Sequence, residues 1–395
     1  MATLGNRGPA HVVKFFSKHP HLARYVTELG IAMGRSYHAS NLRPAAGGSM
    51  AAALELLQRV KYLHIFTPNW IAANWRDFPS IVTEAVISYM DGLPANLDEA
   101  VISYMDGLSA NLDGIARIRL TRLGEIPEDL GRFVLARFPV VSLAHSAFLV
   151  GSGPRVRAAT TILQRLSVMF PDLVQPATLR MLTRYRTTLL ELTAVTPKLE
   201  YLSIDLSASG GLNDGGHQLG PHAQTPANTG PLPRLTHLRH FTIAFEYRYT
   251  WMRTGLTPVT ANLPTFLTGL LRVVNPAEHF PSLSTLLLKV AVLDASLQYE
   301  ESKPLYAIPK PLSVLDDVLA DFGTRTRWVF LNSPSERDAS ASAVRQLGRP
   351  MDARHSEAFA DALSEALPTT AGNGLQVLSN DDPWVAAMGE EKFDF

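Results

Sequence analysis

The sequence predicts an α/β fold in which short strands alternate with helices and run parallel to one another. One observation is an apolar spacing, L-x-x-L-x-L, that recurs along the chain. Another is the helical period of the segments between these units. A third is the length of those segments, because a crossover between parallel strands needs about a dozen residues or more. We therefore expect parallel strands on one side and helices on the other.

Three copies of the apolar unit are complete. In each copy the first apolar residue is expected to close a turn, and the last two share one face of a short strand because strand side chains alternate. The complete copies contain Leu199, Leu202 and Ile204; Leu238, Phe241 and Ile243; and Leu283, Leu286 and Leu288. A stack of such units is a leucine-rich-repeat-like solenoid, an architecture that serves as a binding scaffold.

Weaker copies before and after these three bring the expected number of strands to eight. They contain Val60, Leu63 and Ile65; Ile115, Ile118 and Leu120; Pro139, Val141 and Leu143; Trp328 to Leu331; and Leu375 to Leu378. Apolar stripes at helical spacing separate some of the units. These stripes run from Phe266 to Val274, from Leu315 to Phe322, and from Phe359 to Ala366, where Pro368 ends the last one. The spacings exceed the roughly 20 to 29 residues of standard repeats, so the predicted solenoid is irregular.

One repeat domain over residues 19–380 is the expected organisation, between an N-terminal tail at 1–18 and a C-terminal tail at 381–395. Residues 207–231 are rich in Gly, Pro, Ser and Asn and are expected to form a flexible loop within this domain.

The segment 84–113 is a tandem duplication. Residues 84–98 and 99–113 are identical except that Ser109 stands where the first copy has Pro94. Repeats under separate packing demands would differ more, so we interpret the duplication as recent or as an error in the predicted gene. We expect no function from it.

The composition gives little information about a ligand. Lys and Arg together number 36, as do Asp and Glu, so no overall charge favours nucleic acid or an anionic membrane. The chain has no cysteine, which excludes disulfides and thiolate metal sites. No stretch approaches the roughly 18 apolar residues that a membrane helix needs. We expect a cytoplasmic or nuclear protein that binds neither membranes nor nucleic acid.

No motif for catalysis, a cofactor or a metal stands out. His237 and His240 have a helical metal-ligand spacing, but they precede or begin a predicted strand and have no nearby carboxylate. Asp316 and Asp317 are adjacent, so their side chains are expected to point apart into solvent. The aromatic and basic stretch 245–253 could stack bases, but it more often packs under a helix. We do not expect an enzyme or a cofactor.

Residues 19–26, which read HPHLARYV, are followed by Leu29 and Ile31. This phrase resembles the segment after the F-box in fungal, basidiomycete-type F-box/leucine-rich-repeat proteins. The resemblance implies a substrate receptor of an SCF ubiquitin ligase, in which an F-box holds the adaptor subunit and the repeats select the protein to be ubiquitinated.

The sequence departs from that family in two respects. Only eighteen residues precede His19, fewer than the roughly forty of a small helical module such as an F-box. We therefore expect the F-box to be missing and the SCF adaptor to bind only if an F-box exists upstream. The asparagine that usually follows the unit is replaced by Ser207, Glu246 and Ala291 in the complete copies.

The residues between the buried leucines should form the ligand-binding face of such a solenoid. Its chemistry is mixed, which suits protein recognition better than a phosphate backbone. The candidate contacts are Arg117, Arg119, Tyr201, Ser203, Asp205, His240, Thr242, Thr285 and Lys289.

We therefore expect a protein-recognition module that resembles the substrate-binding part of an SCF receptor. Its partner is expected to be another protein. One alternative is a stand-alone scaffold without a ligase connection, which the missing F-box favours. A less favoured alternative is a divergent α/β hydrolase, which would need a pocket joining a nucleophile, a histidine and a carboxylate.

Overall fold

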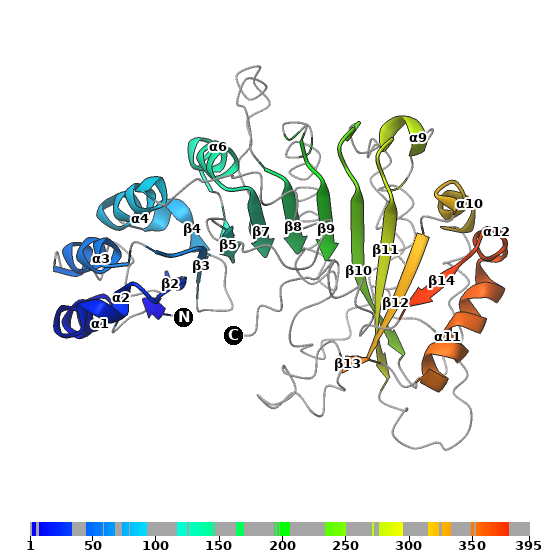
Figure 1. The fold of residues 1–395 in the computed structure, drawn as a ribbon, viewed down its shortest axis with the longest axis horizontal. Helices are drawn as coiled ribbons and strands as arrows, with labels where there is room; N and C mark the ends of the chain where they lie inside the picture. Colours follow the sequence, from blue (N-terminus) through cyan, green and yellow to red (C-terminus); the bar gives the residue numbers. More distant parts are fainter. Residues whose placement is uncertain are drawn as a thin grey trace, which may run out of the picture. The chain divides into compact units, whose positions relative to one another are not determined.

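A computed structural model gives the fold of the chain, which divides into two compact units (Figure 1). Unit 1 comprises Met1–Met169 and Tyr185–Leu199, and unit 2 comprises Phe170–Arg184 and Glu200–Phe395. The structure describes residues 2–4, 8–33, 45–57, 59–67, 73–78, 80–92, 117–124, 126–144, 146, 163–169, 193, 196, 198–205, 234–249, 271, 276–294, 315–323, 326–332, 349–350 and 353–378.

Unit 1 alternates strands with helices. Its elements are β1 (Ala2–Leu4), α1 (Gly8–Lys18), α2 (Pro20–Ala23), β2 (Glu28–Ala32), α3 (Ala45–Glu55), β3 (Tyr62–Phe66), β4 (Ala73–Asn74), a 3-10 turn (Trp75–Asp77), α4 (Ser80–Gly92), β5 (Arg117–Thr121), β6 (Leu123–Gly124), α6 (Glu128–Arg137), β7 (Val140–Ala144) and β8 (Arg165–Met169). The strands β1, β2, β3, β5, β7 and β8 pair in that order, all parallel, while β4 and β6 form a separate small pair.

The helices of unit 1 lie on one side of this sheet, where α1 packs on α3 and α3 on α4 (Figure 1). The α4 sequence explains this packing, because Val82, Val86 and Met90 recur every four residues on one helical face and are buried. Ile81 and Glu84 lie on the exposed part of the same helix. The buried strand positions and the helix stripes together form the core of unit 1.

Unit 2 contains the longest strands that the structure describes. Its elements are β9 (Tyr201–Asp205), β10 (His240–Tyr249), α9 (Pro276–His279), β11 (Thr285–Asp294), α10 (Asp316–Ala320), β12 (Thr326–Asn332), β13 (Arg349–Pro350), α11 (Ala353–Ala366), α12 (Pro368–Gly372) and β14 (Gln376–Leu378). The strands β9, β10, β11 and β12 pair in parallel, and β12 also pairs with parallel β14 and antiparallel β13. Each unit is thus an α/β structure with a predominantly parallel sheet.

All eight predicted strands are present, and the strands among them that pair with one another are parallel as expected. The turn before each complete unit also forms, because the first apolar residue donates its N–H three residues back along the chain. These bonds are Leu199 N to Thr196 O at 3.1 Å, Leu238 N to Leu235 O at 3.2 Å, and Leu283 N to Phe280 O at 3.0 Å. The expected total of eight strands is wrong, since β1, β2, β8 and three two-residue strands were not predicted.

Residues 1–18, expected to be a tail, contain β1 and α1. Pro9 lies in the first turn of α1, where its missing N–H costs nothing, and Pro20 follows the end of the helix. Two predicted helical stripes correspond to α10 and α11. The first copy of the duplication continues α4 as far as Gly92, whereas the second copy lies outside the described residues. The predicted loop 207–231 and tail 381–395 lie outside them too, as does the helical stripe 266–274 apart from Leu271.

Asp316 joins two helices of unit 2, contrary to the expectation that it faces solvent. Its carboxylate is buried and accepts the N–H of Thr369 at 2.9 Å, and the N–H and hydroxyl of Thr370 at 2.8 Å each. These N–H groups begin α12 and have no acceptor within the helix. Burial by itself raises the pKa of Asp316, but the hydrogen bonds from Thr370 and Thr369 outweigh it and hold the pKa below its usual value.

We predict that Asp316→Ala lowers the free energy of unfolding by about 2 to 3 kcal/mol, because one buried and one part-buried helix N–H group lose a charged acceptor. The matched control is Asp317→Ala, which removes an exposed carboxylate from the next position. Urea denaturation followed by tryptophan fluorescence measures both. Because the native pKa is depressed, the contribution is complete above about pH 4 and declines below it. Equal stability of the two variants at neutral pH contradicts the prediction.

Candidate functional site

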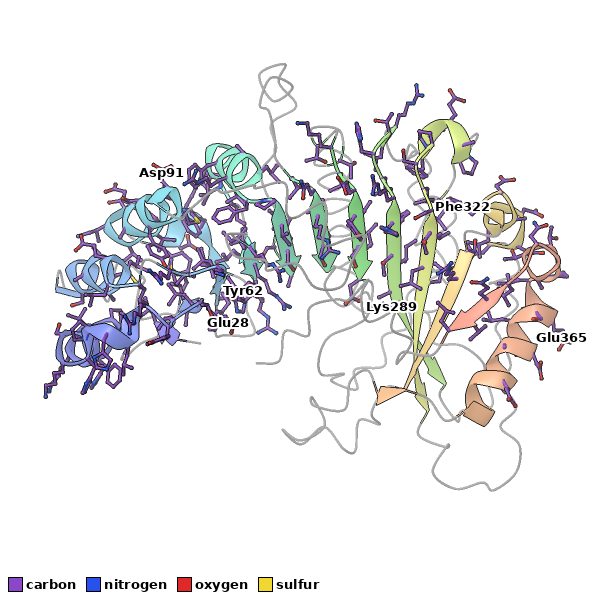
Figure 2. The ribbon with its side chains drawn as sticks, in the orientation of Figure 1. Glu28, Tyr62, Asp91, Lys289, Phe322 and Glu365 are labelled. Carbon is purple, nitrogen blue, oxygen red and sulfur yellow. The ribbon has the colours of Figure 1, made fainter. Side chains whose placement is uncertain are left out.

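The two candidate residues of unit 1 lie on the predicted strand, β5. Arg117 and Arg119 alternate there with the buried residues Ile118 and Leu120, and both arginines are half-buried. Because successive strand side chains point to opposite faces, the arginines lie on the side of the sheet away from the helices. Figure 2 shows Glu28 and Tyr62 on that same side, whereas Asp91 lies on α4.

The register of the sheet extends this face across neighbouring strands. In one row Tyr62 pairs with Arg117, Arg117 with Val140, and Val140 with Arg165. Two residues further along the strands, the aligned row is His64, Arg119, Ser142 and Ser167. Sequence reasoning missed Tyr62, His64 and Arg165. Tyr62 and His64 alternate with Leu63 and Ile65, the apolar residues of a predicted strand. The strand alternation that identified Arg117 would therefore have identified them too.

His64 is the most deeply buried ionisable side chain among these candidates, with 6 % of its surface exposed. Its Nε2 lies 2.9 Å from Oγ1 of Thr121, and its ring stacks on Phe66 with centroids 4.6 Å apart. Burial, together with the positive charge of Arg119, lowers the pKa of His64 from 6.5 to about 3. The imidazole is therefore neutral at physiological pH and contributes shape and hydrogen bonding to the face, not charge.

Tyr62 lies among charged groups of the same face. Burial raises the pKa of its hydroxyl above the ordinary value, while the nearby charges of Arg119 and Arg117 lower it and that of Glu28 raises it further. The phenol thus stays protonated at neutral pH beside the arginines. An aromatic ring near guanidinium groups can make both apolar and polar contacts with a ligand.

Several candidate residues of unit 2 lie on β9 and β10. Tyr201, Ser203 and Asp205 alternate with buried Leu202 and Ile204, and all three are half-buried.

His240 is half-buried too and pairs with Tyr201 in the sheet. Their rings lie 4.6 Å apart, and Oγ of Ser284 lies 3.5 Å from Nδ1 of His240. The structure therefore brings these candidates together on the first two strands of unit 2.

Three other candidates of unit 2 are buried. Thr242 is 8 % exposed, Thr285 3 % and Lys289 7 %. On β11 the intervening Leu287 is fully buried, as are Leu286 and Leu288 on either side of it, so this strand is covered on both faces. The unbroken apolar run at 286–288 is typical of a strand covered on both faces. In the sequence, this run is the feature that indicates that buried and accessible residues do not alternate along β11.

The histidine pair and the aromatic stretch noted in the sequence lie before and within β10. His237 is exposed in the turn before β10, and His240 begins that strand. Within the described ranges, His, Asp and Glu side chains form no cluster of three or more that could hold a metal ion. The backbone of 245–249 belongs to β10, while the side chains of this aromatic stretch lie outside the described part of the structure.

Comparisons with known proteins provide no assignment. Neither a protein family nor a curated protein sequence matches this chain. In the portion of the chain that the structure describes, no helix is long and apolar enough to cross a bilayer. What the structure defines is an α/β protein with mainly parallel strands, in which unit 1 carries an arginine-rich sheet face.

We predict that the buried, neutral His64 makes folding dependent on pH. The unfolded state takes up a proton near pH 6.5 and the folded state only near pH 3. Above pH 6.5, His64 is neutral in both states and does not lower the free energy of unfolding. Below pH 6.5, protonation favours the unfolded state, so the free energy of unfolding falls by about 1.4 kcal/mol for each pH unit until the native histidine also protonates. Urea denaturation between pH 7 and pH 4.5, at ~0.5-unit steps, should show a shallower pH dependence for His64→Gln than for the wild type.

The matched control is His237→Gln, which removes an exposed imidazole instead. If the stability curve of His64→Gln ran parallel to that of the wild type over this range, the described environment of His64 would be wrong.

Proposed function

We propose that this chain recognises another protein through the strand faces that lie away from its helices, and that its fold is an irregular leucine-rich-repeat-like solenoid. The observation that carries the proposal is the register of the strands. Apolar residues align on the helix side from strand to strand, so the alternating residues also align into rows on the other side. Rows of this kind give a repeat protein a continuous binding surface.

A repeated backbone arrangement at the strand starts supports the solenoid part of the proposal. Two successive N–H groups donate to one carbonyl, that of the residue just before the neighbouring strand. The pairs are Lys61 and Tyr62 to Thr27, Gln164 and Arg165 to Pro139, Arg239 and His240 to Glu200, and Ser284 and Thr285 to Arg239. Recurrence of the same turn along a chain is what stacked supersecondary units produce.

Ser146 supports the same interpretation from the other end of the strands. It stands three residues after Leu143, the position where the usual unit has asparagine. Its hydroxyl accepts the N–H of Leu123 at 3.0 Å and lies 3.1 Å from the carbonyl oxygen of Leu120. A short polar side chain thus satisfies backbone groups that leave the neighbouring strand, which is the role that favours Asn or Ser in such turns.

The accessible side chains suit protein recognition. Tyr62, Arg117, Arg119 and Tyr201 are half-buried, so each is held in place yet has surface left for a partner. Tyrosine and arginine are among the residue types that most often dominate the binding energy of protein interfaces. The candidates Thr242, Thr285 and Lys289 are buried and are not proposed as contacts.

The connection to ubiquitination rests on the phrase at 19–26. These residues form α2 and the turn before β2, where Val26 donates its N–H to Ala23 O at 3.1 Å. Val26, Leu29 and Ile31 thereby make one more copy of the repeated unit. We propose a receptor-like module of the SCF type, with a scaffold that has no ligase connection as the alternative, and no enzymatic activity in either.

The test is affinity purification of the tagged chain from its native cells after mild crosslinking, with mass spectrometry of the bound proteins. A specific partner should be recovered with the wild type and lost at least in part with Tyr62→Ala or Tyr201→Ala. Ile81→Ala, which truncates an exposed residue of α4, is the control and should leave recovery unchanged.

The identity of the recovered proteins separates the two forms of the proposal. SCF adaptor and cullin among them would support the receptor, and other partners alone would support the scaffold. If the wild type enriches no protein above a tag-only sample, or if the strand-face variants behave like Ile81→Ala, the proposed function is contradicted.

A further inference from the structure

The strand face of unit 1 concentrates positive charge. We call Tyr62, Arg117, Arg119 and Arg165 the arginine face. Arg117 and Arg119 are two residues apart on β5, and Arg165 is aligned with Arg117 two strands away. Strand geometry places these Cα atoms about 7 Å apart along β5 and about 10 Å apart across the sheet. Arginine side chains are long enough to bring three guanidinium groups to one bound segment.

Negative charge on the same face is limited to its edge. Among the described strand positions that share this face, the only carboxylate is Glu28, on β2. Each arginine already interacts with other groups of the chain, but a guanidinium has five N–H donors and can bind a further acceptor. The face is thus a local excess of positive charge in a chain whose overall formal charge is zero.

We infer that the arginine face binds an acidic, Asp/Glu-rich segment of the partner protein. This inference rests on the proposed function and specifies the chemistry of the partner. Guanidinium groups bind carboxylates through paired, charge-assisted hydrogen bonds. An extended segment presents every second side chain on one side at intervals of about 7 Å, which matches the spacing of Arg117 and Arg119 along their strand. The half-buried ring of Tyr62 lies beside these arginines and can pack against the segment.

The composition of the face favours an acidic protein segment over a nucleic acid backbone. The arginines are flanked by half-buried Val140 and, on the neighbouring strand, by half-buried Phe66, which offer apolar surface. Binding to a phosphate backbone draws on a wide field of positive charge, and this chain has equal numbers of basic and acidic residues. A short acidic segment needs only the local cluster.

The test measures direct binding by fluorescence anisotropy with the purified full chain. The probe is a fluorescein-labelled peptide that repeats the sequence Glu-Tyr-Asp-Gly, and its uncharged counterpart repeats Gln-Tyr-Asn-Gly. Labelled oligothymidine is the nucleic acid probe. The wild type should bind the acidic peptide at least about tenfold more tightly than either of the others, with an affinity that falls as salt is added.

Two matched variants remove equal charge. Arg117→Gln, Arg119→Gln and Arg165→Gln together should weaken binding of the acidic peptide by about tenfold or more. Arg24→Gln, Arg59→Gln and Arg76→Gln together remove three exposed arginines elsewhere in unit 1 and should change it by less than about twofold. Glu28→Gln should strengthen binding. Circular dichroism of each variant confirms that the chain is folded.

Several outcomes would overturn the inference. These are no measurable binding of the acidic peptide to the wild type, equal losses in the two triple variants, or tighter binding of oligothymidine that depends on Arg117, Arg119 and Arg165. If partners are recovered from cells regardless of these arginines, protein recognition stands and the acidic-segment inference fails. If no partner is recovered at all, the proposed function itself fails, whatever the peptide does.

Discussion

The alignment of one apolar pair per strand is the constraint on which the rest of the structure depends. In unit 1, Leu63 and Ile65 pair in register with Ile118 and Leu120, which pair in turn with Val141 and Leu143. Strand side chains alternate with a period of two, so a slip of one residue would expose the apolar pair and bury the arginines of β5. Burying unpaired guanidinium groups costs several kcal/mol, and the register is therefore strongly specified. Both the helix-covered core and the polar face follow from it.

The sequence contains enough information to predict this alignment wherever the apolar unit is complete. Strand positions, parallel direction and the sidedness of Arg117 all follow from spacing. The same spacing is present in Leu163, Leu166 and Val168 before and within β8, and in Val26, Leu29 and Ile31, so these strands were within reach of the same rule. The strand β1 could not be predicted by this rule, because its three residues are too few to show a period.

Burial on the strand face could be predicted only in part, because it depends on packing between elements distant in sequence. The alternation rule treats β5 and β11 alike, yet Arg119 is half-buried while Lys289 is almost completely buried. The run of leucines on β11 gives a local hint of a strand covered on both sides. Asp316 shows the same limit in the opposite direction, because the groups that donate hydrogen bonds to it, on α12, lie over fifty positions further along the chain. No local pattern connects such residues.

Parallel strands that are held in register by their own apolar pairs leave the connecting chain free to change in length. The duplicated sequence lies in the connection between β3 and β5, whose five paired positions remain aligned. Doubling the length of a flexible connection costs only about 0.6 kcal/mol of closure entropy. Insertions between strands that leave the buried helix faces in place are thus nearly neutral in such an architecture, so related genes can diverge widely in length while they keep one recognition surface.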